Sequence, residues 1–244
     1  MEKYLLILGA NSDIANAIAH KFAQEGYNLY LASRDTEKLK VNAKDIEVRY
    51  NVKVKYFYFD ALNYSSHKQF YQNLPLKPEG VVCAFGYLGD QKKAQTDFKE
   101  VKQIINTNFT GCVSILNIIA NDFEQRKRGF IIGISSVAGD RGRKSNYIYG
   151  SAKAGFTVYL SGLRNRLSKA GVQVITVKPG FVQTKMTQNM KLPKILTAKP
   201  QEVAEDIYKA MKKRKDVVYT KWMWQYIMLI IKLIPEKIFK KMSL

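Results

Sequence analysis

The sequence contains few cysteines and histidines and no long apolar run. Its 244 residues include 2 cysteines, Cys83 and Cys112, and 2 histidines. Two cysteines do not make a disulfide framework, so we expect a reduced, cytoplasmic protein in which both thiols are buried as small apolar groups. No apolar stretch reaches the roughly 18 residues of a membrane span, and the first apolar run is too short for a secretory signal. His20 and His67 lie away from the predicted strand ends, and no spacing of Cys, His and acidic residues suggests a metal site.

Acidic residues are scarce beside basic ones. Lys and Arg number 40 against 20 Asp and Glu, which gives a formal net charge of +20. Such an excess raises the question of nucleic acid or an anionic membrane surface as a partner. The basic residues occur throughout the chain, without an arginine-rich tract or an aromatic–basic alternation. We therefore predict no nucleic-acid partner and treat the basic C-terminal segment separately.

Short apolar segments alternate with helical patterns along the whole chain. The apolar segments are residues 3–8, 28–33, 53–60, 80–86, 129–136 and 172–180. Helical patterns follow at 13–26, at 36–50, shortly before 75, at 97–125 and at 149–169. This alternation predicts a Rossmann-type, doubly wound α/β fold: a parallel sheet of about seven strands with helices on both faces. We see no linker, so residues 1–244 are expected to form one domain that binds ligands beyond the carboxyl ends of its strands.

The segment ILGANSDIA joins the first predicted strand to the first helix. Gly9 ends the strand and the helix is expected to begin at about Asp13, which leaves free backbone N–H groups and the positive helix end for a phosphate. Asn11, Ser12 and Asp13 are also good N-cap residues, so a plain helix start is the alternative interpretation.

The second strand ends in the sequence YLASRD. In dinucleotide-binding folds, an arginine at this position accommodates the 2′-phosphate of NADP(H), whereas an acidic residue holds the ribose hydroxyl of NAD(H). Arg34 favours NADP(H) here, and NAD(H) becomes the cofactor if Asp35 turns inward instead. A solvated arginine at the strand end is the third possibility.

Tyr149 and Lys153 are four residues apart and therefore lie on one face of a helix. The spacing alone is weak evidence, because two other Tyr–Lys pairs in the chain share it. Only Tyr149 follows closely after an apolar strand that ends in serine, at Ser135 and Ser136. A hydroxyl, a phenol and an ammonium group therefore converge where this fold binds ligands.

Five motifs in order resemble the short-chain dehydrogenase/reductase family from Tyr4 to about Met186. Residues 9–15 correspond to the glycine-rich turn, Asp60 to the aspartate that contacts adenine, residues 83–86 to the NNAG motif, and KPGFVQT to the PG motif beside the nicotinamide. Asn108, Ser136, Tyr149 and Lys153 correspond to the catalytic set. The resemblance implies that the cofactor is bound by Gly9, Asn11, Ser12, Asp13, Ile14, Arg34, Asp60, Ala61, Ala84, Gly86, Tyr149, Lys153, Pro179, Gly180, Val182 and Thr184.

The family resemblance implies hydride transfer between NADP(H) and a carbonyl or alcohol carbon. Tyr149 would be the general acid in reduction, and the ammonium of Lys153 would favour its phenolate form. Ser136 would hydrogen-bond the substrate oxygen, and Asn108 would hold a water that relays protons from Lys153. The alternative is a non-catalytic protein that binds NADP(H) as a sensor or scaffold.

The chain departs from the family pattern in its glycine-rich turn. Asp13 and Ala15 replace two glycines, and Cys83 and Ala84 replace two asparagines. Alanine at the third glycine still allows close packing of helix and strand. Our hypothesis for Asp13 is that it caps its own helix through the N–H of Ala15 or Asn16, with its carboxylate turned away from the pyrophosphate.

Two C-terminal segments are expected to form the part of the active site that faces the substrate. Residues 185–200, the lid segment, vary within the family and are expected to cover the active site. Residues 221–244, the C-terminal tail, combine two tryptophans and an apolar run with five lysines. This composition fits a helix in a membrane interface, on the inner face of the cell membrane, and it fits equally a helix packed on the domain or in an oligomer contact.

Short motifs narrow the resemblance further. GYLGDQ at 86–91, the SDIA turn and the tail are similar to reductases of polyprenyl-phosphate-linked keto-sugars, which implies a lipid-linked carbonyl substrate in cell-envelope polysaccharide synthesis. The resemblance also implies a homodimer or homotetramer formed through the helices that begin near Asp97 and Tyr149.

Overall fold

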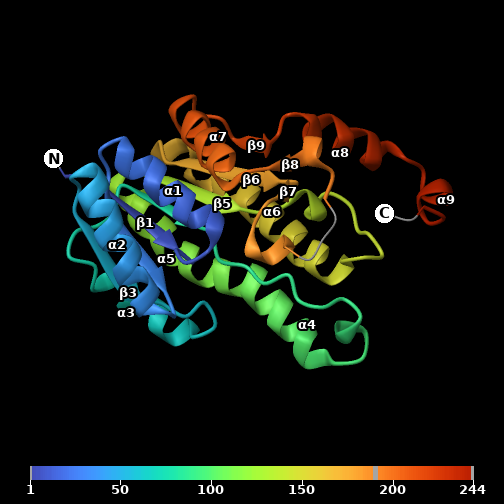
Figure 1. The fold of residues 1–244 in the computed structure, drawn as a ribbon, viewed down its shortest axis with the longest axis horizontal. Coiled ribbons are helices and arrows are strands. Elements are labelled where there is room, and N and C mark those ends of the chain that lie inside the picture. Colours follow the sequence, from blue (N-terminus) through green and yellow to red (C-terminus); the bar gives the residue numbers. More distant parts are fainter. Residues whose placement is uncertain (1, 189–191, 243–244) are drawn as a thin grey trace.

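Seven parallel strands form one sheet, as the alternation of segments predicts. The computed structural model describes residues 2–188 and 192–242, so residues 189–191 of the lid segment and 243–244 of the tail lie outside the described chain. The strands are β1 (Tyr4–Leu8), β2 (Asn28–Ser33), β3 (Val54–Tyr58), β4 (Gly80–Cys83), β5 (Phe130–Ile134), β6 (Gln173–Pro179) and β9 (Val217–Thr220). Their order is β3-β2-β1-β4-β5-β6-β9 (Figure 1). A separate parallel pair joins β7 (Phe181–Val182) to β8 (Thr197–Ala198).

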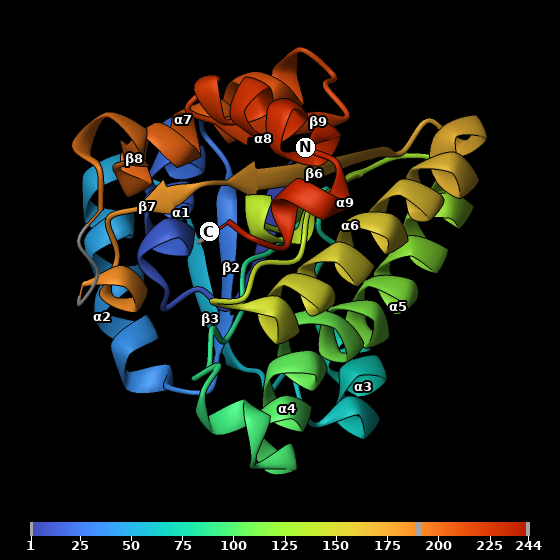
Figure 2. The same cartoon turned by 90° about the vertical axis from the view of Figure 1, so that its right-hand side faces the viewer.

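Helices cover both faces of the sheet. The long helices are α1 (Asp13–Gln24), α2 (Thr36–Tyr50), α4 (Phe98–Ile105), α5 (Gly111–Arg126), α6 (Tyr147–Leu167), α7 (Pro200–Lys212) and α8 (Met223–Leu233), and the short ones are α3 (His67–Gln72) and α9 (Glu236–Phe239). Helices α1, α2 and α7 lie on one face, and α3, α5 and α6 lie on the other (Figure 2). All five residues of β1 are buried because both faces of this strand are covered.

The strand order reverses direction between β1 and β4. The chain proceeds from β1 toward β3 on one side and from β4 toward β9 on the other, so the loops after β1 and β4 diverge. In open parallel sheets the crevice that such loops leave at the carboxyl ends is where ligands bind. The fold therefore places Gly9, which follows β1, and residues 84–86, which follow β4, at one site.

The helix predicted for residues 97–125 is interrupted. Helix α4 ends at Ile105, five residues (Asn106–Thr110) form a π-helical turn, and α5 begins at Gly111. Gly111 packs against the backbone of Ala61, where an added Cβ would lie 2.5 Å from the Ala61 carbonyl oxygen. Single π turns inside helices occur frequently at functional sites, and this one carries Asn108.

The C-terminal tail packs on the domain through one face of α8. Trp224 and Met228 are buried and form a cluster with Val137, against which Phe181 and Leu196 also pack. The packing alternative is therefore correct for this face of the helix. Helix α9 projects from the body at the end of the chain (Figure 1). No helix within the described residues is long and apolar enough to cross a membrane.

Candidate active site

The turn after β1 brings backbone rather than side chain into the crevice. Gly9 has a φ of +80°, and an added Cβ would lie 2.6 Å from the backbone nitrogen of Phe85. Only glycine combines this backbone conformation with such a close approach. Ser12 is the N-cap of α1, and its Oγ accepts the N–H of Ala15 at 3.2 Å. The positive end of α1 therefore faces the crevice beside Gly9.

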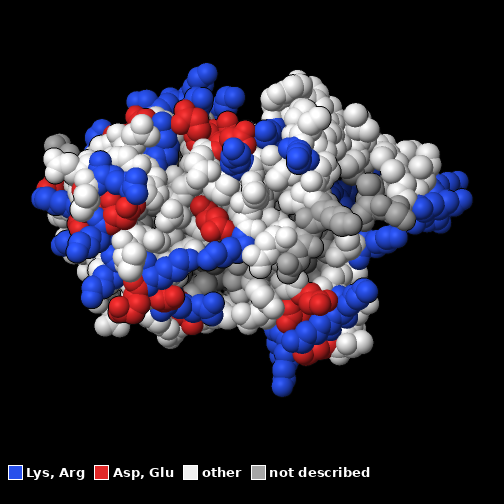
Figure 3. Space-filling model, in the orientation of Figure 1, with Lys and Arg blue, Asp and Glu red and all other residues white. Residues whose placement is uncertain are grey.

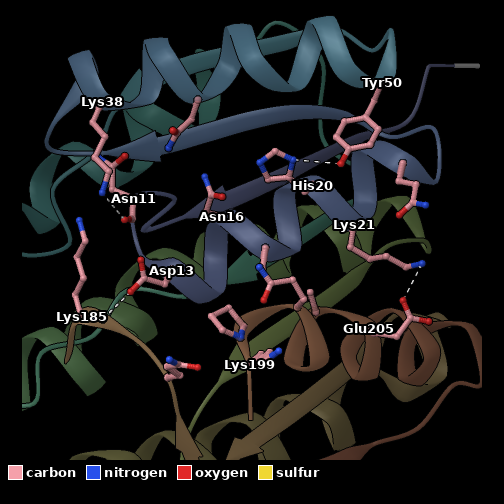
Figure 4. A pocket seen from close by; sticks show the side chains of 17 residues that line it. Asn11, Asp13, Asn16, His20, Lys21, Lys38, Tyr50, Lys185, Lys199 and Glu205 are labelled. Carbon is pink, nitrogen blue, oxygen red and sulfur yellow. Dashed lines mark hydrogen bonds and ion pairs between the residues drawn. The ribbon is translucent and has the colours of Figure 1, made fainter. Parts of the chain in front are cut away.

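Asp13 does not cap its own helix, so the capping part of our hypothesis for this residue is wrong. Ser12 takes the cap position, and Asp13 is the first residue of α1. The Asp13 carboxylate accepts the backbone N–H of Lys185 at 2.7 Å instead, as Figure 4 shows. Asp13 thus connects the turn after β1 to the first residue of the lid segment, a contact between residues 172 positions apart.

The start of α2 is tied to the same turn. Asp35 is the N-cap of α2 and accepts the N–H of Lys38 at 3.1 Å, so its carboxylate serves the helix. Asn11 donates to the Asp35 carbonyl at 2.8 Å, and the Lys38 ammonium donates to the Asn11 carbonyl at 3.0 Å. Arg34 is exposed at the strand end. Two cations, Arg34 and Lys38, therefore flank this part of the turn. Our sequence analysis did not include Lys38, which could have been found as a basic residue in the first turn of the second helix.

A narrow cavity of about 150 Å³ extends from Gly9 along the carboxyl ends of the strands. It is lined by Gly9, Ser33, Arg34, Phe59, Asp60, Ala61, Leu62, Phe85, Gly86, Tyr87, Gln103 and Thr107, five of which are predicted cofactor residues. Within the described residues, the buried Thr107 Oγ1 and Asn11 Oδ1 have no hydrogen-bond partner. A glycine cradle, a neighbouring cation and unpaired polar atoms together fit a dinucleotide.

The two serines after β5 have different environments. Ser135 is 3% exposed, and its Oγ bonds the Lys153 carbonyl at 3.0 Å and the Thr157 hydroxyl at 2.7 Å. Ser136 is half-buried and its Oγ accepts the N–H of Ala138 at 3.1 Å, which leaves its O–H free to donate. Ser135 therefore fastens α6 to the sheet, and Ser136 is the serine available to a substrate oxygen.

Tyr149 and Lys153 share the face of α6 that borders the crevice. The Lys153 side chain is 3% exposed, and its ammonium donates to the Ile134 carbonyl at 3.0 Å. It lies 5.8 Å from the centroid of the Tyr149 ring. An ammonium group has three donors, so two remain for a ligand. Tyr149 is half-buried, and within the described residues its hydroxyl makes no hydrogen bond, which leaves it available to a ligand.

Asn108 holds the loop that follows β4. Its side-chain amide donates to the Tyr87 carbonyl at 2.6 Å and to the Ile104 carbonyl at 2.8 Å, and it accepts the Tyr87 N–H at 3.2 Å. Gly86 lies between Asn108 and Lys153, where an added Cβ would be 2.9 Å from the Asn108 Oδ1 and 3.5 Å from the Lys153 nitrogen. The structure thus gives Asn108 a positioning task that the sequence did not indicate, and its water relay stays a prediction.

The PG motif connects the crevice to the lid segment and to α8. Pro179 ends β6, and Gly180 lies against the Trp224 indole, where an added Cβ would be 2.0 Å from the ring. Val182 belongs to β7, and Thr184 is the N-cap of the short helix that begins at Lys185. The predicted residues Ile14 and Ala84 lie beside the turn after β1, since Ile14 is in the first turn of α1 and the Ala84 N–H bonds the Leu8 carbonyl at 2.9 Å.

Both histidines lie outside this constellation. His67 is fully buried and bonds the Ser114 hydroxyl and the Asp60 carbonyl, so it is a packing residue. His20 lies 3.3 Å from the Tyr50 hydroxyl in a polar groove of about 880 Å³ that runs along α1 between α2 and α7 (Figure 4). Among the residues that the structure describes, no group of His, Cys, Asp and Glu could hold a metal ion.

Known proteins share both the sequence pattern and the fold. The short chain dehydrogenase family model matches residues 3–194. An uncharacterized oxidoreductase of Mycobacterium tuberculosis is 34% identical over 241 residues, which cover 98% of this chain and 96% of the relative. The structure of a short-chain dehydrogenase from Sphingobium yanoikuyae in complex with NADPH has a TM-score of 0.84 at 22% identity and covers 96% of this chain and 97% of that one. The chain belongs to the short-chain dehydrogenase family of oxidoreductases.

Proposed function

We propose that this protein is an NADPH-dependent reductase of a carbonyl substrate. The observation that carries the proposal is the convergence of Ser136, Tyr149 and Lys153 beside the crevice that begins at Gly9. Three facts support NADPH over NADH: Arg34 borders the crevice, Asp35 is engaged as a helix cap, and the Sphingobium enzyme holds NADPH. Lys38 adds a second cation near Arg34.

The residues of the site suit reduction. When bound, NADPH supplies a hydride to the carbonyl carbon. Tyr149 donates its hydroxyl proton to the carbonyl oxygen, so that the C=O group becomes an alcohol. The Ser136 hydroxyl donates a hydrogen bond to the same oxygen, where negative charge develops. Lys153, 5.8 Å from the Tyr149 ring, stabilises the phenolate that remains, and its two further donors can hold ribose hydroxyls.

A non-catalytic sensor or scaffold is the less favoured function. Such a protein would need the crevice and Arg34, but it would have no use for an unpartnered phenol beside a buried ammonium group. The altered glycine turn, which suggested this alternative, does not aim a free carboxylate at the crevice, because Asp13 is bound to Lys185.

For the finer substrate class, we propose a carbonyl compound that carries hydroxyl groups on a lipid-linked carrier, such as a keto-sugar, with the protein at the cytoplasmic side of the membrane. Buried polar atoms without partners among the described residues support the hydroxyl groups: Gln91 Nε2, Arg143 Nε and Asn146 Oδ1, on the two loops that flank Tyr149. Gln91 is close to Tyr149 because its Oε1 accepts the Ile148 N–H at 3.1 Å.

The proposed oligomer is a homodimer or homotetramer formed through α4, α5 and α6. Phe98 on α4 and Val158 on α6 are 67% and 71% exposed, and the space beside Gly162 on α6 is open. Light scattering of the purified protein checks this state, and a monomer at every concentration would contradict it.

Substitution of Tyr149 tests the function. We expect Tyr149→Phe to lower kcat for ketone reduction by about 10²- to 10⁴-fold while NADPH binding, followed by its fluorescence, is kept. The matched control is Tyr147→Phe, on the same helix but 41% exposed, which should leave kcat unchanged. NADPH binding without turnover of any ketone, aldehyde or keto-sugar in the wild-type protein would favour the sensor instead.

A further inference from the structure

Helix α8 has a second apolar face that points away from the domain. The face opposite Trp224 and Met228 consists of Trp222, Tyr226, Leu229, Ile230 and Leu233, which are 70%, 57%, 51%, 65% and 73% exposed. Their spacing of 4, 3, 1 and 3 residues places them on one stripe along the helix. The surface over α8 is correspondingly free of charged side chains in Figure 3. We call this stripe the outer face of α8.

The outer face is held in a fixed position on the active-site side of the molecule. Arg141, from the loop between Ser136 and Tyr149, donates to the carbonyls of Ile231 and Ile234 at 2.8 and 2.6 Å. It also pairs with Glu236 at 2.9 Å, and its guanidinium lies 3.9 Å from the centroid of the Phe239 ring. These contacts satisfy carbonyls that the end of α8 would otherwise leave unpaired.

Basic residues border the outer face. Lys232, near the end of α8, and Lys237, Lys240 and Lys241, in and after α9, are exposed. Figure 3 shows basic side chains at the end of the molecule where α9 lies. Glu236 is the acidic residue of the tail, and its charge is paired with Arg141. An apolar stripe with a basic border complements the acyl boundary and headgroups of an anionic membrane. A second copy would instead bring another chain of net charge +20 against these lysines.

We propose that the outer face of α8 and the lysines around α9 dock the protein on an anionic lipid surface, with α8 lying in the plane of the interface. The inner face of the same helix packs on Gly180 and on Val137, the neighbour of Ser136. Docking therefore brings the catalytic crevice to the lipid surface without burying it in lipid. The purpose of this arrangement, access to a lipid-linked carbonyl, rests on the proposed function; the docking itself does not.

Co-sedimentation with vesicles tests the docking. We expect the full-length protein to bind vesicles of phosphatidylglycerol and phosphatidylcholine in equal parts, to bind pure phosphatidylcholine far more weakly, and to be released as salt is raised. The double variant Leu229→Ser/Leu233→Ser should lose at least about tenfold in affinity, because two exposed apolar side chains no longer enter the interface. Val41→Ser/Val48→Ser, which changes two apolar side chains of α2 that are 69% and 79% exposed, is the matched control and should bind as the wild type does.

A second pair of variants separates the local charge from the net charge. Lys237→Gln/Lys240→Gln/Lys241→Gln should weaken binding to the anionic vesicles on the order of a hundredfold. The control variant Lys40→Gln/Lys44→Gln/Lys68→Gln removes the same charge from exposed positions on and near α2 and α3, and we expect a much smaller loss.

Three results would overturn the docking. The wild-type protein could fail to bind anionic vesicles, or the Leu229→Ser/Leu233→Ser variant could bind them as tightly as the wild type does. The third is light scattering that shows a dimer for the wild type and a monomer for this variant. The last result would identify a second copy as the occupant of the outer face. Reduction of a water-soluble ketone separates the docking from the reductase function, because the variants of the outer face and of the lysines should still catalyse it. Wild-type protein that binds vesicles but reduces no carbonyl would refute the reductase and leave the docking intact.

Discussion

Replacement of Trp224 by alanine should remove the main attachment of α8 to the domain. The indole is 3% exposed, lies against Gly180, packs edge-on against Phe181 at 5.2 Å between ring centroids, and donates to the Leu196 carbonyl at 3.0 Å. Truncation of a buried tryptophan costs about 3–5 kcal/mol, of which the hydrogen bond and the ring pair contribute about 1 kcal/mol each. Because α8 packs on the domain through one face and can detach locally, we expect a loss at the low end of this range, about 3 kcal/mol in the free energy of unfolding.

Chemical denaturation followed by circular dichroism measures this loss. Trp222→Ala is a matched control on the same element, because Trp222 is 70% exposed, and it should change the free energy of unfolding by less than about 0.5 kcal/mol. Since the chain has 2 tryptophans, the fluorescence of Trp224→Ala should be that of an exposed indole, shifted to longer wavelength. Equal losses in the two variants, or no such spectral shift, would refute the packing of α8 on Gly180.

Arg34→Ala should weaken NADPH binding about tenfold without weakening NADH binding, because a lost charge-assisted contact to the 2′-phosphate affects only NADPH; equal losses in fluorescence titrations would contradict this role. Asp13→Ala should leave the Lys185 N–H without its acceptor and speed limited proteolysis in the lid segment. Asp13→Asn keeps an acceptor and should leave the rate of proteolysis unchanged. Tighter NADPH binding in both variants would instead indicate that the Asp13 charge repels the cofactor. Burial lowers the pKa of His67, so the stability it contributes is complete above the unfolded pKa of about 6.5 and falls as the pH drops below it. Denaturation of His67→Gln between pH 7 and pH 5 should show a flatter decline than wild type.

The position of the crevice could be predicted from the sequence because short-range patterns determine where the strands that border it end. The apolar run before Gly9 fixes where β1 ends, and the run before Ser136 fixes where β5 ends. The carboxyl ends of parallel strands meet at one edge, so residues at these positions converge wherever the helices between them lie. The π turn at Asn108 was missed because its cause is tertiary: the Asn108 amide bonds the Tyr87 backbone, and helical periodicity contains no sign of that contact.

The substrate side could not be predicted in the same way, because contacts between distant residues build it. The sequence around Asp13 predicts a helix start, so we expected its carboxylate to cap that helix. Its hydrogen-bond partner is instead the backbone N–H of Lys185. Composition left two interpretations of the C-terminal tail as equal alternatives, and the structure shows why neither excluded the other. Helix α8 is apolar on both faces: Trp224 occupies the space that Gly180 leaves by lacking a side chain, while Leu229 and Leu233 point outward. Arg141, on the loop between Ser136 and Tyr149, bonds the carbonyls of Ile231 and Ile234, so a contact between distant residues sets how α8 lies relative to the crevice.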